Sequence, residues 1–322
     1  MLVALRAGRR LRASLFARLI LALALADLWG VGFTLYRVRP AGDVLAEGET
    51  AAAWLARQAR PFRVYSPSYS IPQHTGAVYA IEAVDGMDPF QLADYAAFMR
   101  AAAGVNLPGY SIIIPPLPEV ASGEDALLGL QDVLPDLRLL GLLNVRYLAA
   151  AYPLETEGLV LLRERGGVHL YRNEQALPRA FVVGRAETVE GLEGALAWLS
   201  ENDPAGAAAV EGGPPLEGPE GMWDARILQL TPNRILVEAK GPGFLVLGEV
   251  YDPDWRVWID GREAEMYRTD GILRGVYLEA GLYHVTFVYW PAGLGVGCGA
   301  TVVGWVAAVA LCLRGRRQVG GR

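Results

Sequence analysis

The sequence predicts a membrane-anchored α+β protein, in which a mixed α/β unit precedes an antiparallel β-sandwich and two transmembrane helices flank them. Three observations predict this class. Hydrophobic residues make up 52% of the 322-residue chain, and the mean hydropathy of +0.24 is high for a soluble globule. Apolar runs bordered by arginines lie near both ends. Between them, helical periodicity comes first and short alternating runs follow.

The formal net charge of -6 is the sum of three blocks of different sign. Residues 1–37 carry a net +5 and residues 291–322 a net +4, whereas residues 38–290 carry a net -15. An acidic centre of this size argues against a nucleic-acid partner. Because arginine-rich flanks stay in the cytoplasm, the pattern predicts that both termini are cytoplasmic and that residues 38–290 are extracytoplasmic.

The first apolar run predicts a transmembrane helix over residues 19–36, after a cytoplasmic basic segment formed by residues 1–18. Asp27 lies at its middle, and an intramembrane acid normally faces protein or water rather than lipid. Asp27 therefore indicates other transmembrane helices as partners, from a bundle or a separate subunit. A cleaved signal peptide is the alternative, because residues 24–26 (Ala-Leu-Ala) form a small-x-small pattern. In that case only the second run would anchor the chain.

The outer region begins with residues 38–200, which are expected to form the mixed α/β unit. Helical patterns cover residues 50–58, 90–103, 125–133 and 137–143, and strand patterns cover residues 62–66, 144–149, 159–164 and 168–172. Asp88 and Pro89 form a typical helix start, with Asp as the N-cap and Pro in the first turn. Residues 201–221 contain five Gly and four Pro and are expected to form a linker.

Residues 222–290 predict the antiparallel β-sandwich, of immunoglobulin or jelly-roll type. Six short runs, separated by Gly, Pro and Asp turn signals, cover residues 225–230, 234–239, 244–250, 255–260, 275–278 and 283–290. Only Pro291 then separates the last strand from the second apolar run, so the sandwich is expected close to the bilayer.

That second run, residues 292–313, has 22 residues without a charge and is followed by three arginines. At about 1.5 Å per residue it covers the roughly 30 Å hydrocarbon core of a bilayer. We therefore expect a transmembrane helix over residues 292–313 and a cytoplasmic basic tail over residues 314–322. Both cysteines lie in this run, so the outer region is expected to fold without disulfides.

The chemistry-bearing residues gather in residues 65–95. The chain has no phosphate-binding loop, nucleophile elbow or zinc-type histidine pair, and its three histidines lack ligand spacing, so we expect neither cofactor nor metal. Aromatic rings stack on sugars and carboxylates accept hydrogen bonds from sugar hydroxyls, so residues 65–95 predict a glycan-binding site. The candidate contacts, with one arginine from a later strand, are Tyr69, Gln73, His74, Asp85, Asp88, Tyr95 and Arg146.

Two acidic groups leave alternatives open. Asp85 and Asp88 can form a carboxylate pair, or Asp88 caps a helix while Asp85 makes the turn at Gly86. The acidic segment 249–255 can hold Ca²⁺ through oxygen ligands, or it forms an Asp-Pro turn before a core tryptophan.

Several stretches also resemble the YfhO-type bacterial membrane protein family, and they occur in family order. They are residues 26–29, 64–72, 84–90, 142–148, 178–183, 249–255 and 267–276. The resemblance implies a polytopic membrane protein similar to the glycosyltransferases that use lipid-linked sugars to modify envelope polymers. The expected catalytic acid belongs to an extracytoplasmic loop near the first membrane helices, which has no counterpart in this sequence.

The resemblance therefore implies that this chain corresponds to the C-terminal portion of such a protein, without a complete active site. Its expected partners are the lipid bilayer, the missing helices, and an envelope glycan or polyprenyl-phosphate sugar. A stand-alone membrane-anchored glycan-binding or envelope-assembly protein, without catalytic activity, is the alternative.

Overall fold

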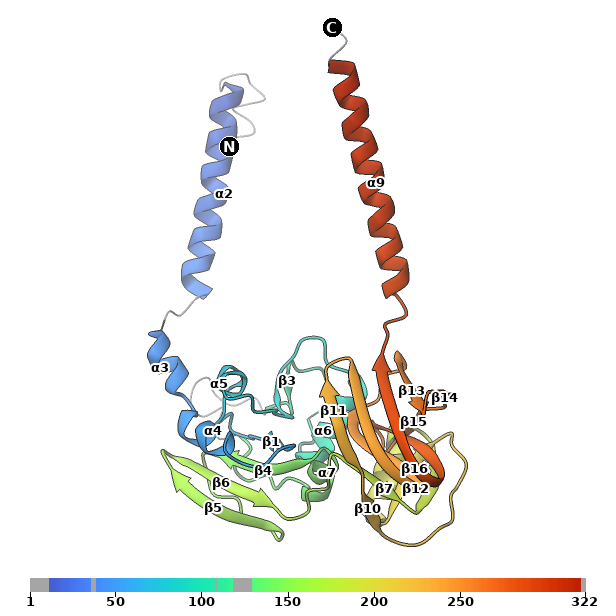
Figure 1. The fold of residues 1–322 in the computed structure, drawn as a ribbon. Helices are drawn as coiled ribbons and strands as arrows, with labels where there is room; N and C mark the ends of the chain where they lie inside the picture. Colours follow the sequence, from blue (N-terminus) through green and yellow to red (C-terminus); the bar gives the residue numbers. More distant parts are fainter. Residues whose placement is uncertain (1–11, 36–38, 108, 118–128, 320–322) are drawn as a thin grey trace. The chain divides into compact units, whose positions relative to one another are not determined.

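The computed structural model describes residues 12–35, 39–107, 109–117 and 129–319, which divide into two compact units. The first unit, residues 1–47, contains helices α2 (Ala13–Leu35) and α3 (Ala41–Ala46) (Figure 1). Within α2, residues Ala13–Gly32 are long and apolar enough to cross a membrane, a property that signal sequences share. Asp27 is an exposed residue of this helix.

The second unit, residues 48–322, contains three sheets and confirms the predicted α+β class. Its four-stranded sheet has the order β1-β4-β6-β5, with β1 parallel to β4 and the other pairs antiparallel. The strands are β1 (Arg63–Tyr65), β4 (Val145–Ala150), β5 (Leu159–Arg165) and β6 (Val168–Asn173), as expected from the sequence. Helices α4 (Glu49–Leu55) and α5 (Gln73–Val78) belong to the same part of the chain, and Leu55, Phe62 and Tyr147 pack in one buried cluster there.

A turn at residues 89–90 replaces the start of the helix expected over residues 90–103. Strand β2 (Gly86–Met87) precedes the turn, helix α6 begins only at Ala93–Ala102, and the chain then returns so that β3 (Ile113–Ile114) pairs with β2. The prediction that Asp88 caps this helix is therefore wrong. Its Oδ1 accepts a hydrogen bond of 2.8 Å from Phe90 N–H and stabilises the turn after β2. Helix α7 (Leu137–Leu142) forms as expected, whereas most of the helix expected over 125–133 lies outside the described residues.

The third sheet has ten strands and includes segments from both sides of the expected linker. Its main path runs β10-β7-β12-β16-β15-β9-β8; β11 pairs with β12, and β13 pairs with β14 and β16. The strands are β7 (Ala180–Val183), β8 (Arg185–Val189), β9 (Ala207–Glu211), β10 (Met222–Asp224), β11 (Arg226–Thr231), β12 (Arg234–Val250), β13 (Trp255–Ile259), β14 (Arg262–Ala264), β15 (Tyr267–Thr269) and β16 (Leu273–Tyr289).

Strand β9 lies inside residues 201–221, so this segment is not a linker throughout. Its residues 208–210 are fully buried, and the strand is parallel to β8. Helix α8 (Gly191–Glu201) connects the two strands. Gly and Pro residues surround β9, but its small apolar side chains fill the core beside α8, and this burial decides the local structure. The boundary between the compact units lies at residue 47.

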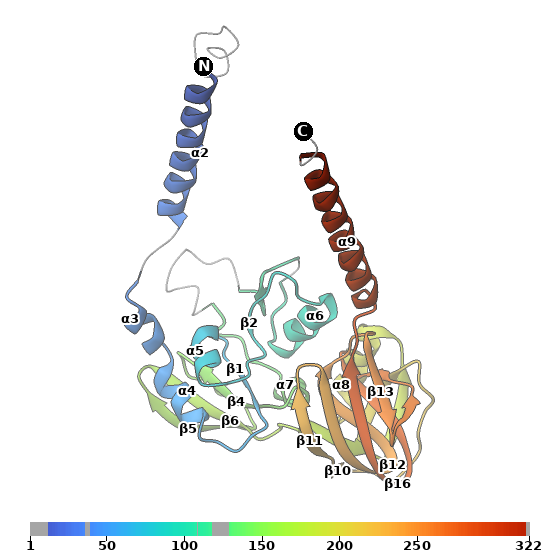
Figure 2. The ribbon, with the colours of Figure 1, turned by 45° about the horizontal axis from the view of Figure 1, so that its top comes forward.

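A long antiparallel pair of strands, β12 and β16, forms the sandwich-like part of this sheet. Each strand has 17 residues, where four separate short strands were expected, and the two lie side by side (Figure 2). Gly241 faces Gly281 at an irregularity in the pairing, and the backbones are so close there that a Cβ on Gly241 would lie 2.0 Å from Glu279 O. The two halves of this strand pair enclose a core that includes Val237, Leu245 and Phe287.

Helix α9 (Leu294–Val319) follows β16 after only four residues. Backbone hydrogen bonds fix this connection: Tyr289 N–H donates to Asn233 O and Trp290 N–H to Asp254 O, each at 3.0 Å. The apolar stretch of α9 among the described residues, Leu294–Val309, is shorter than that of α2. Helix α9 is thus mounted directly on the end of the large sheet.

Candidate functional site

Asp85 is a buried carboxyl group beside the end of β1. Residues 82–84 run along β1, because Val64 N–H donates to Glu82 O at 2.9 Å and Val84 N–H donates to Val64 O at 3.0 Å. Asp85 then places its Oδ1 2.8 Å from Ser66 N–H, which donates to it. The residue is only 8% exposed. The backbone that follows β1 thus fixes the position of the carboxyl group.

The loop between β1 and α5 surrounds Asp85 with polar side chains. Ser66 Oγ donates to Ala149 O at 2.9 Å, and Ser68 Oγ accepts a hydrogen bond of 2.8 Å from Ala151 N–H, so both serines tie the loop to β4. Tyr69 adopts a left-handed φ of 50° and closes the turn by donating its N–H to Ser66 O. Sequence reasoning missed these two serines, although residues 65–70 (Tyr-Ser-Pro-Ser-Tyr-Ser) have a serine at every second position.

Three tyrosines lie around the same carboxyl group. Tyr95 Oη donates to Val84 O at 2.6 Å, and Tyr69 Oη donates to Gly86 O at 3.4 Å, so they contact the residues on either side of Asp85. Burial, followed by the negative charge of Asp85, raises the pKa of Tyr65 and of Tyr69. These phenols therefore remain neutral at physiological pH. We call the set Asp85, Ser66, Gln73, Tyr65, Tyr69 and Tyr95 the Asp85 cluster.

Burial raises the pKa of Asp85 to about 7, although the backbone N–H groups that donate to the carboxylate act in the opposite direction. Within the described ranges, no arginine or lysine forms an ion pair with Asp85. The group is therefore divided between its neutral and charged forms near neutral pH. The neutral form can donate a hydrogen bond, and the charged form only accepts.

A cavity of about 240 Å³ opens beside Asp85, between β1, the following loop and α5. Asp85, Ser66 and Gln73 form its polar side, and Val64, Ile71 and Ile81 contribute apolar walls. Gln73 is exposed, and its Nε2 lies 3.5 Å from Met87 O. Pockets for drug-sized ligands measure roughly 300–1,000 Å³, so this cavity suits a smaller group such as one sugar residue.

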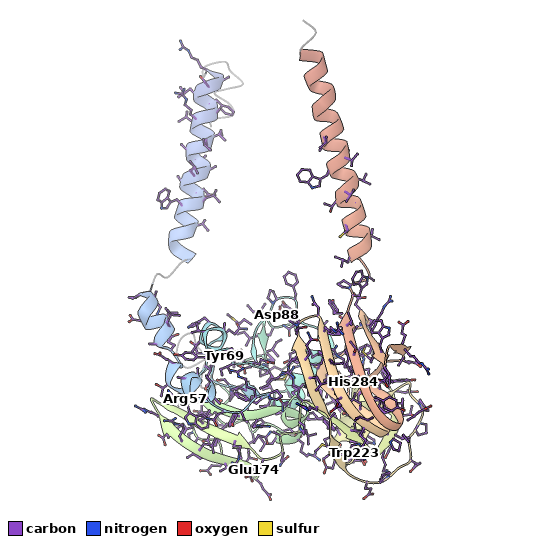
Figure 3. All side chains as sticks on the ribbon, in the orientation of Figure 1. Arg57, Tyr69, Asp88, Glu174, Trp223 and His284 are labelled. Atoms are coloured by element: carbon purple, nitrogen blue, oxygen red, sulfur yellow. The ribbon has the colours of Figure 1, made fainter. Side chains whose placement is uncertain are left out.

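The structure brings together four of the seven predicted contact residues: Tyr69, Gln73, Asp85 and Tyr95 all lie against residues 84–87. His74 follows Gln73 on α5 and is exposed. Asp88 is exposed just after β2 (Figure 3). Its hydrogen-bond partners differ from those of Asp85, so the two do not act as a carboxylate pair.

Arg146 is the predicted contact that lies elsewhere. It lines a different cavity, of about 270 Å³, together with Arg179 and Arg226. Residues on alternate positions of a strand face opposite sides of the sheet, so its place on β4 does not bring its side chain to the loop after β1.

A second buried carboxyl group, Asp270, lies in the turn between β15 and β16. It is fully buried, its Oδ1 accepts a hydrogen bond of 2.9 Å from Ala209 N–H, and its Oδ2 has no hydrogen-bond partner among the described atoms. Burial raises the pKa of Asp270 to about 7 as well. Because it contacts β9 and not the cavity beside Asp85, it is a matched reference for that group.

Sequence reasoning missed a network of charged side chains that joins the four-stranded and ten-stranded sheets. The Arg179 side chain is 4% exposed; its Nη1 donates to Glu82 Oε2 at 2.7 Å and its Nε to Glu249 Oε1 at 2.6 Å. Arg63 Nη2 donates to Glu249 Oε2 at 2.9 Å. Burial alone would raise the pKa of Glu249, but Arg63 and Arg179 hold it below its usual value. Each charge is matched, which indicates a structural role.

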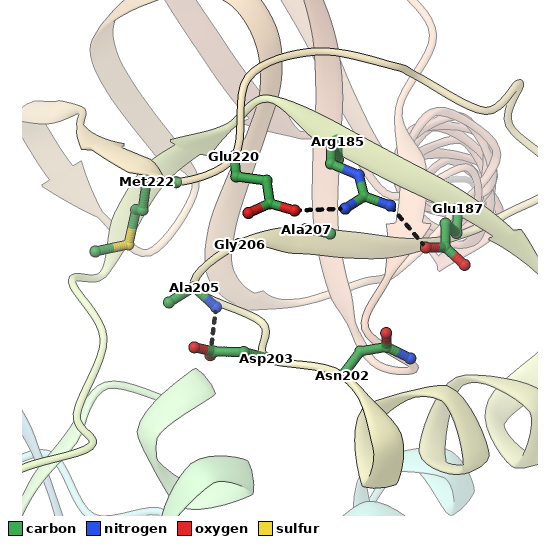
Figure 4. A pocket seen from close by; sticks show the side chains of 10 residues that line it. Arg185, Glu187, Asn202, Asp203, Ala205, Gly206, Ala207, Glu220 and Met222 are labelled. Atoms are coloured by element: carbon green, nitrogen blue, oxygen red, sulfur yellow. Dashed lines mark hydrogen bonds and ion pairs between the residues drawn. The ribbon is translucent and has the colours of Figure 1, made fainter.

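A larger cavity, of about 680 Å³, lies at β8 and β9 (Figure 4). Its charged groups pair with each other: Arg185 lies 3.2 Å from Glu220 Oε1 and 3.7 Å from Glu187 Oε1. Asp203 Oδ1 accepts a hydrogen bond of 2.9 Å from Ala205 N–H. With these partners in place, its charged groups do not converge on a common point as a binding site requires.

The acidic segment 249–255 is occupied by internal contacts. Glu249 belongs to the charged network, and Asp252 Oδ1 accepts a hydrogen bond of 2.8 Å from Asp254 N–H in the turn before β13. In the part of the chain that the structure describes, no three His, Cys, Asp or Glu side chains form a group that could hold a metal ion. The Asp85 cluster is thus the arrangement with a buried, unpaired charge beside a cavity.

Comparison with protein-family models, with curated proteins and with solved structures finds no match to this chain. The functional proposal therefore depends on the chemistry of the Asp85 cluster and on the sequence patterns.

Proposed function

We propose that this chain is the C-terminal, extracytoplasmic region of a YfhO-like polytopic membrane protein that serves glycosylation of a cell-envelope polymer from a lipid-linked sugar. In this proposal α2 and residues 292–313 cross the membrane, both termini are cytoplasmic, and the Asp85 cluster engages a sugar residue. The order of the family-like segments supports the assignment, and the basic-acidic-basic charge pattern supports the orientation.

The buried carboxyl group of Asp85 is the observation that carries the binding role. A carboxylate in a nearly dry site without a basic partner lowers the stability of the fold, and Asp85 differs from the similarly buried Asp270 in that it lines the cavity beside β1, where a ligand can reach it. Sugar hydroxyls supply hydrogen-bond donors to such an acceptor, and Gln73 and Ser66 add further polar groups at the same cavity. Tyr69 adds an aromatic ring beside it.

The geometry favours binding over bond cleavage within this chain. Hydrolysis or transfer at a glycosidic carbon uses two carboxyl groups that flank one bond. Among the described residues Asp85 is the one carboxyl group that lines this cavity, and Asp88 faces solvent just after β2. Catalysis then belongs to the membrane region that the resemblance implies, and the Asp85 cluster holds an acceptor or donor sugar for it.

Calorimetric titration of the full chain in detergent micelles tests the binding role, with glucose, galactose and N-acetylglucosamine as probes. Hydroxyl donors stabilise the charged form of Asp85, so the wild-type protein should bind more tightly at pH 8 than at pH 6. A hydrogen bond to a charged group contributes about 1.5–3 kcal/mol, so Asp85→Asn should weaken binding roughly tenfold or more.

Asp270→Asn is the matched control, because Asp270 is also buried and also has a pKa of about 7 but does not line the cavity. It should leave sugar affinity unchanged. An equal loss of affinity in both variants, or no binding of any probe to the wild type, would remove the glycan-binding role. The DNA upstream of Met1 distinguishes the polytopic protein from a stand-alone glycan-binding protein, because only the former continues in frame into further hydrophobic helices.

A further inference from the structure

The segments that follow β2 and precede β3 expose a group of large apolar side chains that the proposed sugar site does not use. We call it the β2–β3 patch: Met87, Phe90, Leu92, Tyr110 and Ile112. Phe90 is 91% exposed and Tyr110 71% exposed, and the other members are about half exposed. Exposed apolar groups of this size, gathered on one feature, mark an interaction surface.

The patch is held in place by hydrogen bonds. Two hydrogen bonds join the segment after β2 to the segment before β3: Asp88 N–H donates to Ile112 O at 2.8 Å, and Tyr110 Oη donates to Pro89 O at 2.8 Å. Asp88 Oδ1 accepts from Phe90 N–H, and Gln91 Nε2 donates to Ser111 O. The aromatic rings are therefore presented on braced loops in which several polar backbone groups are already paired, which lowers the cost of insertion into an apolar medium.

Within residues 48–322, the β2–β3 strand pair and the start of α9 lie on the same side of the sheets. Figures 1 and 2 both show the β2–β3 region and the first turn of α9 on that side, and Figure 3 places Asp88 there. Only four residues separate β16 from α9, and Trp290, among them, is exposed. If α9 crosses a membrane, the surface from which it departs lies against the bilayer, and the patch lies on that surface.

We propose that the β2–β3 patch inserts into the interfacial layer of the membrane and holds the extracytoplasmic domain against it. The inference rests on the proposed membrane role of α9. Aromatic and aliphatic side chains prefer the boundary between headgroups and acyl chains. Asp88 adds a negative charge beside the patch, so attachment depends on apolar insertion and not on attraction to anionic lipids.

This placement gives the domain a second contact point besides α9, and it brings the Asp85 cluster close to the membrane surface. Gly86 at the start of β2 follows Asp85 directly and Met87 of the patch comes next, so the sugar site and the patch adjoin along the chain. A sugar carried on a membrane-embedded lipid is presented at this level.

Depth-dependent fluorescence quenching tests the inference on the full chain in phosphatidylglycerol nanodiscs. Phe90→Cys, in a chain in which Cys298 and Cys312 are replaced by alanine, carries an environment-sensitive fluorophore. The matched control is Leu161→Cys, an exposed apolar position of β5, the strand that Figure 1 shows on the opposite side of the domain. Nitroxide-labelled lipids should cause a loss of fluorescence at position 90 and none at position 161. Tyr110→Asp in the labelled chain should reduce the loss at position 90.

Equal, weak quenching at both positions, in a chain that resists carbonate extraction, would overturn the inference and leave the membrane anchor intact. A chain that carbonate extracts would overturn both proposals. If position 90 is shielded from aqueous iodide in native membranes but is not quenched in pure lipid, the patch binds a protein, and lipid insertion is wrong.

Discussion

Replacing Asp85 by asparagine should make the fold more stable at alkaline pH, although it removes a side chain of the proposed site. Asparagine keeps an oxygen that can accept the hydrogen bond from Ser66 N–H, and it never carries a charge. The wild-type carboxyl group must ionise inside the protein as the pH rises. The variant avoids this cost, so the two proteins should differ most at high pH.

The size of the effect follows from the pKa in the two states. An unfolded aspartate titrates near 3.9, whereas Asp85 in the fold has a pKa of about 7. Between these values the folded state retains a proton that the unfolded state has released, so the free energy of unfolding falls as the pH rises from about 4 to about 7 and is level above. Three pKa units correspond to about 4 kcal/mol, an upper bound.

Thermal unfolding of the full chain in detergent, at pH 4.5 and pH 8, measures this difference. One kcal/mol shifts the midpoint by roughly 2–4 °C in a protein of this size, so Asp85→Asn should raise the midpoint at pH 8 by up to roughly 8–16 °C. At pH 4.5 the two proteins should melt within a few degrees of each other. A variant that is less stable than the wild type at pH 8 would show that the folded protein stabilises the charged carboxylate, and the argument for a functional Asp85 would fail.

Three further outcomes are expected. Arg179→Met should lower the free energy of unfolding by about 1.5–3 kcal/mol in urea titrations, because it removes charged hydrogen bonds to Glu82 and Glu249 and leaves Arg63 as the remaining buried partner of Glu249; a loss below about 1 kcal/mol would contradict the structural role of the network. Gly275→Ala should cost about 1–3 kcal/mol in the same titrations, since its Cβ would lie 2.3 Å from a ring carbon of Phe244, and Phe244→Leu should restore part of the loss; an unchanged midpoint would show that the sheet relaxes freely. In intact cells, a membrane-impermeant thiol reagent should label a Glu174→Cys chain and spare cysteines added at either terminus. Labelling at the N-terminus, or a mature chain that begins at Asp27, would contradict the predicted cytoplasmic N-terminus.

The sequence was sufficient where local patterns decide the structure. The four strands β1, β4, β5 and β6 lie within a residue or two of the expected ranges, because each is a short apolar run between clear turn signals. The core of the candidate site was also predicted, since Tyr69, Gln73, Asp85 and Tyr95 lie within one continuous stretch of chain.

Distant pairing decided the elements that the sequence did not reveal. The Gly-Pro-Gly at 241–243 is a strong turn signal, yet β12 continues through it because β16 pairs with both halves. Strand β9 is recognisable only through its burial beside α8 and β8. Arg63, Arg179 and Glu249 are more than sixty residues apart and meet only because the two sheets are packed together.

The direct passage from β16 into α9 has a mechanical consequence. Force that reaches the domain along the helix is transmitted into the strand direction, and the hydrogen bonds of an antiparallel ladder lie across that direction. They therefore resist together in shear, with β12 paired along both halves of β16 and β13 close to α9. Under tension along α9, the pairing of β16 with β12 and β13 should hold until many of its hydrogen bonds break together.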